Sequence, residues 1–297
     1  MLRLHGHNFA GEVTKTTDMT QAMSFAPAVD PLFPARLREL ERVPAGLWFR
    51  GRLPAQHERG VAIVGSRAAT MASVLRTRAI AAELVAAGRF VVSGGALGID
   101  AAAHRGALEA GGATFAVLGC GVDVVYPDTH GKLFEQIAVN GGLVSEYPAG
   151  TPPRPGQFPV RNRIVAGLAD AVVVVEARRR SGALITARLA LELGRPLIAV
   201  PGSAGTDELL TAGLAIPAEG GAEILRRMAG EVVSPQAAPA EMAPLLALLG
   251  DRSDNAAGIA QRLGVSLPAA LGVLAEAELS GWVRRLAGGR YEVPNGG

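Results

Sequence analysis

The sequence predicts an α/β protein with a doubly wound, mostly parallel sheet and a small C-terminal winged-helix domain. Short apolar runs alternate with helix-length segments, and the runs contain Val, Ile and Ala without a polar face, as do strands buried on both faces of a parallel sheet. Three short helical segments followed by two Gly-bounded strands predict the winged helix. The apolar runs lie at residues 61–64, 90–92, 113–118, 143–145, 171–175 and 196–200.

Amphipathic segments at residues 73–87, 101–110 and 183–193 predict helices between these strands. The repetition of strand, helix and strand implies right-handed crossovers in a doubly wound sheet. The loops that follow the parallel strands then gather at one edge of the sheet. Because such sheets bind their ligands at that edge, we expect the functional residues in these loops.

Composition along the chain divides it into five predicted segments. The second of these carries a short helix at residues 35–42, and the last carries helices at 245–249, 256–263 and 269–279. The segments are a disordered lead-in (1–29), a short N-terminal segment (30–60), the sheet domain (61–228), a Pro/Ala linker (229–240) and the winged-helix domain (241–297).

The overall composition excludes several classes of protein. The chain has 297 residues, 49% of them hydrophobic. Its net charge of +2 is too small for a protein that binds nucleic acid through a uniformly basic surface. The single cysteine, Cys120, excludes an intramolecular disulfide framework and a Cys-based zinc site. No apolar run approaches the roughly 20 residues of a membrane span, and the N-terminus lacks the apolar core of a secretory signal. We therefore expect a cytoplasmic protein with no membrane partner, metal or cofactor.

Three turns that follow predicted strands carry residues suited to phosphate. Gly65, Ser66 and Arg67 combine backbone donors, a hydroxyl and a guanidinium. A Gly-rich loop offers a concavity without bulky side chains, and a third turn, beside the arginines of 178–180, precedes a helix N-terminus. The alternative is that these glycines only permit tight turns. The second and third turns contribute Ser93, Gly94, Gly95, Ala96, Gly98, Ser181 and Gly182.

The same turns argue against a dinucleotide or P-loop site. The first lacks the three glycines of a dinucleotide fingerprint, and the chain has no GxxxxGK[ST] motif. Asp100 would repel a phosphate, so we expect it to act as a helix N-cap that shapes the Gly-rich loop. His104 is expected to be a packed scaffold histidine, because no second ligand completes a metal site around it.

The segment from Phe158 to Arg163 places an aromatic, two arginines and Asn162 at the start of a predicted helix. Arg161 and Arg163 cannot lie on one helical face, so they are expected to have different roles. One should reach phosphate, and the other should pair with a buried acid such as Glu176. Phe158 is either a core residue or a platform that stacks on an unpaired base.

In this order and spacing, these motifs closely resemble the DNA-processing protein A family (DprA/Smf). The resemblance covers roughly residues 30–228. It implies a Rossmann-like core that binds and protects single-stranded DNA, has no enzymatic activity, and helps to load RecA recombinase during natural transformation. It also implies a homodimer formed through the C-terminal part of that core. The motifs are Gly65-Ser66-Arg67, Ser93-Gly94-x-Ala96-x-Gly98-Ile99-Asp100, Tyr126-Pro127, Phe158-Pro159-x-Arg161-Asn162-Arg163-Ile164 and Ser181-Gly182-x-Leu184-Ile185.

Carried onto this chain, the resemblance assigns the DNA pocket to Gly65-Ser66-Arg67, the 93–98 loop, Phe158 and Arg161-Asn162-Arg163. The chain departs from the family pattern after Pro201-Gly202, where the loop is shorter than in the family. Within that loop, Asp207 stands where an asparagine is expected.

Three other interpretations remain open. Residues 201–206 also resemble the PGGxGT turn of LOG-type nucleoside-monophosphate phosphoribohydrolases, but Leu209 occupies the position of that family's glutamate and Glu208 is one residue out of register. A transcription factor would use the segment 267–279, which carries no Arg, Lys, Asn or Gln to read base edges. The third interpretation is a structural module with empty glycine turns.

Overall fold

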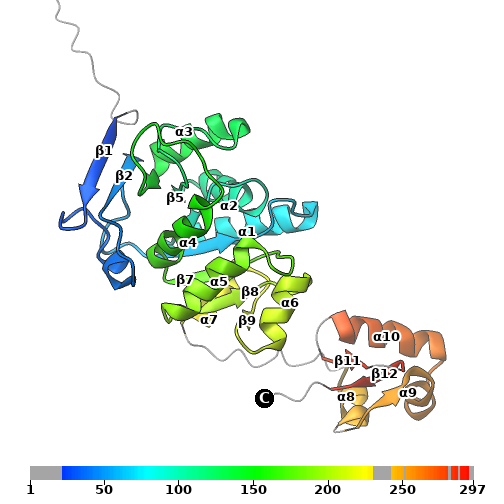
Figure 1. Cartoon of the computed structure of the whole chain (residues 1–297). Helices are drawn as coiled ribbons and strands as arrows, with labels where there is room; N and C mark the ends of the chain where they lie inside the picture. Colours follow the sequence, from blue (N-terminus) through cyan, green and yellow to red (C-terminus); the bar gives the residue numbers. More distant parts are fainter. Residues whose placement is uncertain (1–21, 230–241, 251, 280–281, 287, 294–297) are drawn as a thin grey trace, which may run out of the picture. The chain divides into compact units, whose positions relative to one another are not determined.

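The apolar runs form the strands of a nine-stranded sheet, in the order β1-β2-β6-β5-β4-β3-β7-β8-β9. The sheet lies in the first of the two units, Met1–Glu231 and Val232–Gly297, of a computed structural model (Figure 1). The structure describes residues 22–229, 242–250, 252–279, 282–286 and 288–293. The strands are β1 (Met23–Pro27), β2 (Gly46–Gly51), β3 (Gly60–Val64), β4 (Phe90–Ser93), β5 (Thr114–Val117), β6 (Gly142–Ser145), β7 (Ala171–Val174), β8 (Leu197–Ala199) and β9 (Ile216–Pro217).

Strands β3 to β9 are parallel, which confirms the expected α/β class with a mostly parallel, doubly wound sheet. From β3 the chain runs outward through β4, β5 and β6, and then returns to place β7 on the other side of β3. The strand order therefore reverses between β3 and β7. In open α/β sheets such a reversal creates a crevice at the carboxyl ends of the strands, where ligands bind.

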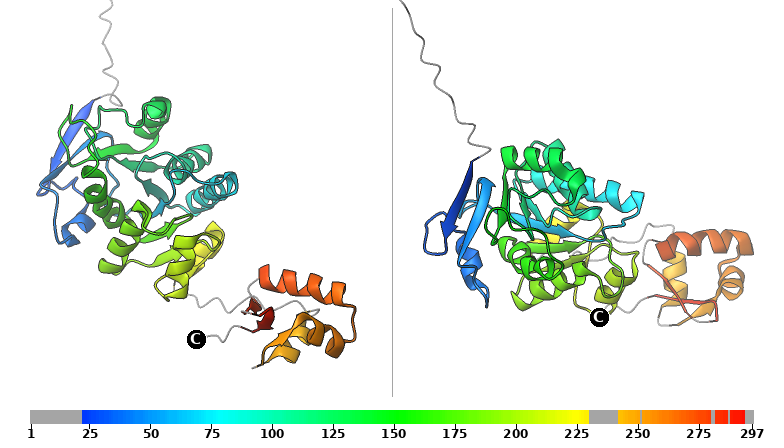
Figure 2. Two further views of the ribbon diagram at one scale, coloured as in Figure 1. Left: turned by 45° about the vertical axis from the view of Figure 1, so that its right-hand side comes forward. Right: turned by 45° about the horizontal axis from the view of Figure 1, so that its top comes forward.

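Helices cover both faces of the sheet (Figure 2). One face buries Ile80, Leu84, Ile99 and Ile224 from α1, α2 and α7. The helices of this unit are α1 (Met71–Ala86), α2 (Ile99–Glu109), α3 (Gly131–Asn140), α4 (Gln157–Leu168), α5 (Gly182–Glu192), α6 (Ala204–Thr211) and α7 (Gly221–Met228), with 3-10 turns η1 (Ala35–Glu39) and η2 (Asp128–His130).

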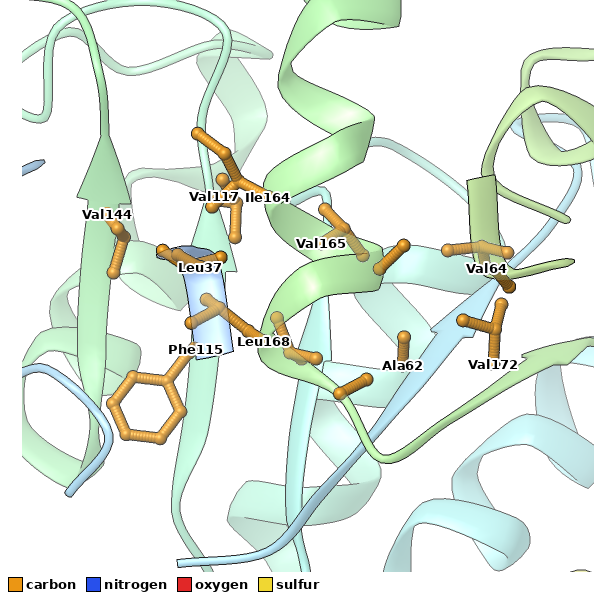
Figure 3. Close-up of a cluster of buried hydrophobic side chains, with 14 of the residues drawn as sticks. Leu37, Ala62, Val64, Phe115, Val117, Val144, Ile164, Val165, Leu168 and Val172 are labelled. Atoms are coloured by element: carbon orange, nitrogen blue, oxygen red, sulfur yellow. The ribbon is translucent and has the colours of Figure 1, made fainter. Parts of the chain in front are cut away.

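Helix α4 anchors the opposite face and so positions the segment that begins at Phe158. Its Ile164 and Leu168 lie against β5 and η1, close to Phe115 and Leu37 (Figure 3). These side chains are fully buried. Burial of each such side chain contributes about 1.5–3 kcal/mol, which fixes the helix and therefore its N-terminal turn.

The N-terminal region differs from the expectation. Met23–Pro27, assigned to a disordered lead-in, forms strand β1, which pairs antiparallel with β2. Because β2 also pairs with β6, the segment expected to stand apart extends the main sheet. Phe25 packs its ring 4.9 Å from that of Trp48, a contact between strands that no local pattern reveals. Residues 1–21 lie outside the described residues.

The helix expected at residues 35–42 is a single 3-10 turn, η1. Leu37 is fully buried, and the backbone becomes extended at Leu40, where ψ is 138°. The extended backbone at Leu40 ends the 3-10 helix, because an extended residue cannot continue the helical hydrogen-bonding pattern. Leu37 is thus buried in the core without a longer helix.

The second unit contains three helices and a three-stranded antiparallel sheet among its described residues, in the strand order β10-β12-β11. Its apolar cluster includes Leu245, Ile259, Leu274 and Tyr291. The winged-helix assignment stays a prediction, and most of the expected linker lies outside the described residues. The elements are α8 (Ala243–Leu249), β10 (Asp254–Asn255), α9 (Ala256–Leu263), α10 (Leu267–Leu279), β11 (Arg284–Arg285) and β12 (Arg290–Glu292).

In the described part of the chain, no single helix has both the length and the apolar character needed to cross a membrane. The bent pair of α9 and α10 reaches that length and composition only when its two helices are counted together.

Candidate functional site

A cleft of about 510 Å³ lies at the carboxyl ends of β3, β4 and β7, at the point where the strand order reverses. The loops after these strands line it, together with the first turns of α4 and α5. The structure thus brings together residues that the sequence spreads over more than a hundred positions. The predicted residues that line the cleft are Gly65, Ser66, Arg67, Gly94, Ala96, Asp100, Phe158, Arg161, Asn162, Ser181 and Gly182.

The first turn packs so closely against Ile99 and Glu176 that position 65 requires glycine. A Cβ at Gly65 would lie 2.6 Å from Cγ1 of Ile99, and the Ser66 N–H donates to the Glu176 carbonyl at 2.7 Å. That N–H is therefore occupied, and the Ser66 side chain also hydrogen-bonds the Glu176 carboxylate. The Arg67 guanidinium is the donor of the turn that remains free. Arg67 is exposed and forms neither a hydrogen bond nor an ion pair with any described residue. Its charge is free to meet an anion.

The Gly-rich loop after β4 contributes its backbone more than its side chains. Ser93 is buried and donates its hydroxyl to the Ile63 carbonyl at 2.6 Å, so it does not line the cleft. Gly95 and Gly98 have φ values of +70° and +75°. The Ile99 N–H donates to the Ser66 carbonyl at 3.1 Å. The two loops are thereby joined into one wall of the cleft.

Asp100 is not the helix N-cap that we expected, because α2 begins at Ile99 and its N-cap is Gly98. The Asp100 carboxylate instead accepts the Ala96 N–H at 3.2 Å, from inside the first helical turn. Gly98 occupies the N-cap position, so Asp100 lies inside the first turn of the helix. The expected effect on the loop remains, since the carboxylate fixes Ala96.

Arg161 is buried beneath the cleft, and its guanidinium donates to the carbonyls of Gly94 and Val117. Burial raises the pKa of Asp100, and the Arg161 charge opposes this rise. Burial also lowers the pKa of Arg161. A Cβ at Gly94 would lie 2.6 Å from both charged groups, so only glycine lets the loop pass between them. Arg161 therefore acts mainly as a buried positive charge that holds the loop.

Arg163 does not pair with Glu176, contrary to one expectation. Its guanidinium donates to Glu146 at 2.9 and 2.6 Å, and it does not line the cleft. Glu176 accepts the N–H and hydroxyl of Thr70 instead. Burial raises the pKa of Glu176, but the bonds from Thr70 outweigh it and leave that pKa below its usual value. Glu176 follows β7 and therefore faces the start of α1 rather than α4.

Phe158 lies in the first turn of α4, which begins at Gln157, and is half-buried. The Arg67 guanidinium lies 5.6 Å from its ring centre, within reach of a cation–π contact. Tyr126 packs against it with ring centres 5.5 Å apart. The Asn162 side chain donates to the Gly182 carbonyl at 3.3 Å and so connects α4 to the start of α5.

The start of α5 completes the cleft with unpaired donors. Its N-cap is Ser181, whose hydroxyl has no hydrogen-bond partner among the described residues. No side chain caps the helix, and the Leu184 N–H donates to the Ser181 carbonyl at 3.1 Å. Among the described residues, the N–H groups of Gly182 and Ala183 therefore remain available. Arg178 also lines the cleft and pairs with no described residue.

His104 is fully buried outside the cleft, with Nδ1 2.8 Å from the Thr114 hydroxyl. Burial lowers its pKa to about 3, so it is a neutral scaffold histidine.

Sequence reasoning gave no site role to Tyr126, Ile185 and Thr186, which also line the cleft. The sequence signal for Tyr126 was the Tyr126-Pro127 motif of the family resemblance. The position of Tyr126 in the cleft depends on the loop after β5. No described group of His, Cys, Asp and Glu could hold a metal.

Comparison with known proteins identifies the family of the chain. The family model for DNA recombination-mediator protein A matches residues 24–231. The chain belongs to this family. Among its relatives, protein Smf of Escherichia coli is 36% identical over 283 residues, covering 89% of this chain and 75% of that protein. Protein Smf of Synechocystis is 46% identical over 60% of this chain, but the match spans only 46% of that relative.

Two solved structures of DNA processing protein A share the fold of the recombination-mediator domain. The Streptococcus pneumoniae protein gives a TM-score of 0.65 at 38% identity, covering 70% of this chain and 75% of that one. The Helicobacter pylori protein gives 0.62 at 32% identity, covering 70% and 96%. The latter protein binds single-stranded DNA.

Proposed function

We propose that this cleft binds single-stranded DNA, and that the chain acts as a recombination mediator rather than as an enzyme. The observation that carries the proposal is the set of unpaired donors at the strand-order reversal: Arg67, Arg178, the Ser181 hydroxyl and the start of α5. Such donors suit consecutive phosphates, which need positive charge and N–H or O–H groups. Family membership and the DNA-binding relative support it.

The aromatic pair favours a single strand over a duplex. Phe158 and Tyr126 lie beside Arg67, where an unpaired base next to a bound phosphate could stack. Bases in a duplex are already stacked and paired, so they cannot use these rings. Among the described residues that line the cleft, Asp100 is the single carboxylate, and it is buried beside Arg161. This favours binding over the phosphoribohydrolase alternative, which needs a catalytic acid.

The wider role is proposed on the family resemblance. We infer that the protein protects single strands in the cytoplasm during DNA uptake and helps to load RecA recombinase onto them. We also infer a homodimer through the C-terminal part of the sheet domain, which would raise avidity if one strand reaches both clefts. We keep the predicted division of the chain into a sheet domain at residues 61–228 and a winged-helix domain at residues 241–297.

Fluorescence anisotropy of labelled oligo-dT and a matched duplex, titrated at several salt concentrations, tests the proposal. We expect the single strand to bind more tightly, with log K falling by about 0.7 per contacted phosphate for each unit of log salt. Arg67→Ala should weaken binding and flatten that slope. Arg105→Ala, an exposed arginine on α2 outside the cleft, is the matched control. Equal binding of duplex and single strand, or cleavage of AMP, would overturn the proposal.

A further inference from the structure

A second cleft of about 510 Å³ lies at the carboxyl ends of β7 and β8, which are neighbours in the sheet. The start of α1, the loop after β7 and the short loop of residues 200–203 between β8 and α6 line it. Arg178 lines both this cleft and the first one. Building on the proposed function, we propose that the second cleft holds further phosphates of the same DNA strand. The strand then continues from the first cleft across the end of β7 to the start of α6.

Three arginine side chains line the second cleft from two separate elements. Arg76 belongs to α1, and Arg178 and Arg179 belong to the loop after β7. Arg178 pairs with no described residue. A guanidinium presents a planar fork of N–H donors that fits phosphate oxygens. Three such groups around one cleft suit consecutive phosphates of a strand better than a single small anion.

The acidic partners of the other two arginines hold them only weakly. Arg76 lies 3.6 Å from Glu219, and Arg179 lies 3.6 Å from Glu208, which is longer than a hydrogen bond. Both glutamate side chains are 62% exposed. Exposed ion pairs of this kind contribute little to stability. A phosphate can therefore replace either glutamate as the partner of its arginine.

Glu176 is the single carboxylate among the described residues that line the second cleft. It accepts the N–H of Thr70 at 2.9 Å and the Thr70 hydroxyl at 3.0 Å. These donors offset its charge and hold it against the start of α1. Because three arginines outnumber this one engaged carboxylate, the charge balance of the cleft favours an anion.

The loop after β8 leaves the second cleft open to a strand. A Cβ at Gly202 would meet no atom within 4 Å. The Ser203 hydroxyl accepts the Ala177 N–H at 3.0 Å, and the Ser203 N–H donates to the Thr206 hydroxyl at 3.3 Å. The loop is thus held by its own bonds and carries only small side chains on this wall. A sugar-phosphate backbone can therefore approach the arginines without displacing it.

The test is a length series of labelled oligo-dT, measured by anisotropy at several salt concentrations. The double variant Arg76→Ala/Arg179→Ala should bind the shortest strands like the wild type, because these strands fill only the first cleft. It should bind long strands about tenfold more weakly, with a salt slope smaller by about 1.4, the value for two lost phosphate contacts. Arg178 stays intact because it serves both clefts. Arg78→Ala is the matched control, since Arg78 lies on the same helix, pairs with the exposed Glu109 and lines neither cleft. It should bind strands of every length like the wild type.

A second variant tests the proposal through a gain of binding, which misfolding cannot produce. Glu208→Gln removes the acidic partner of Arg179, so long strands should bind about twofold to threefold more tightly. The shortest strands should bind as they do to the wild type. Glu109→Gln frees Arg78 in the same way outside both clefts and should change nothing.

The second cleft is no part of the DNA path if the double variant keeps wild-type affinity and salt slope at every length, or loses affinity equally at all lengths. Calorimetric titration with inorganic phosphate tests the other source of the same chemistry. If the double variant loses saturable phosphate binding but binds long strands normally, the cleft takes a free anion and the proposal is wrong. Arg67→Ala should weaken strands of every length. If it changes nothing, or if the wild type binds no single strand, the first cleft itself is wrong.

Discussion

The guanidinium of Arg163 and the carboxylate of Glu146 form a two-pronged ion pair, with N···O distances of 2.9 and 2.6 Å. The Arg163 and Glu146 side chains are only 15% and 16% exposed. The Arg163 Nε also donates to the Arg42 carbonyl at 3.0 Å. The pair therefore ties α4 to the loop after β6 and to the N-terminal segment, while Arg161, two residues earlier, serves the cleft.

Glu146→Ala should lower the free energy of unfolding of the sheet domain by about 1–3 kcal/mol, because it leaves the largely buried Arg163 without its acceptor. Binding of oligo-dT by the folded protein should not change. Urea unfolding measures the first quantity, and anisotropy measures the second. Glu39→Ala is the control, since it removes a similar bond to Arg195, but Glu39 is 58% exposed. Its expected cost is below about 1 kcal/mol. Equal costs for the two variants would contradict a structural role for the Arg163 pair.

Gly98→Ala should disrupt the junction between the first two loops of the cleft. Its φ is +75°, and the added Cβ would lie 2.2 Å from the Ser66 carbonyl oxygen. The expected cost is about 3 kcal/mol or more, together with weaker DNA binding. Gly88→Ala has the same φ and no atom within 4 Å of its Cβ, so it should cost only about 1–2 kcal/mol. Thermal unfolding measures the loss of stability in both variants. Equal losses for Gly98→Ala and Gly88→Ala would show that the two loops can move apart without cost.

The buried His104 should make the protein less stable as the pH falls. Its pKa is about 3 in the folded state, against 6.5 for an ordinary histidine. Between these values the unfolded chain binds a proton that the folded protein does not, so stability rises with pH across this window. One pH unit below 6.5 the effect is about 1.4 kcal/mol.

His104→Gln removes this titration, so the comparison isolates it from other groups. The stability difference between wild type and His104→Gln, measured by urea unfolding from pH 5 to 8, should change below pH 6.5 and stay constant above it. A difference that is independent of pH over the whole range would show that His104 has the same pKa in the folded and unfolded states, against the burial argument.

Much of the fold could be predicted because its signals are local. A buried parallel strand needs apolar side chains on both faces, so β3, β4, β5, β7 and β8 are visible as runs of Val, Ile and Ala. β1 was missed for the opposite reason. It is an edge strand with an exposed Met23 and Phe25, and its pairing with β2 is a contact between distant segments.

The candidate site divides in the same way. The sequence by itself determined that turns rich in glycine, serine and arginine follow β3, β4 and β7 and lie at one edge of the sheet, because these residues adjoin the strand ends along the chain and parallel strands present their ends at one edge. Only the tertiary structure decided that Arg163 meets Glu146, that Gly98 displaces Asp100 from the N-cap, and that Tyr126 stands beside Phe158. The physical reason is that a side chain's partner is set by which loops the sheet brings together and by the space left between them, and neither is written in local spacing.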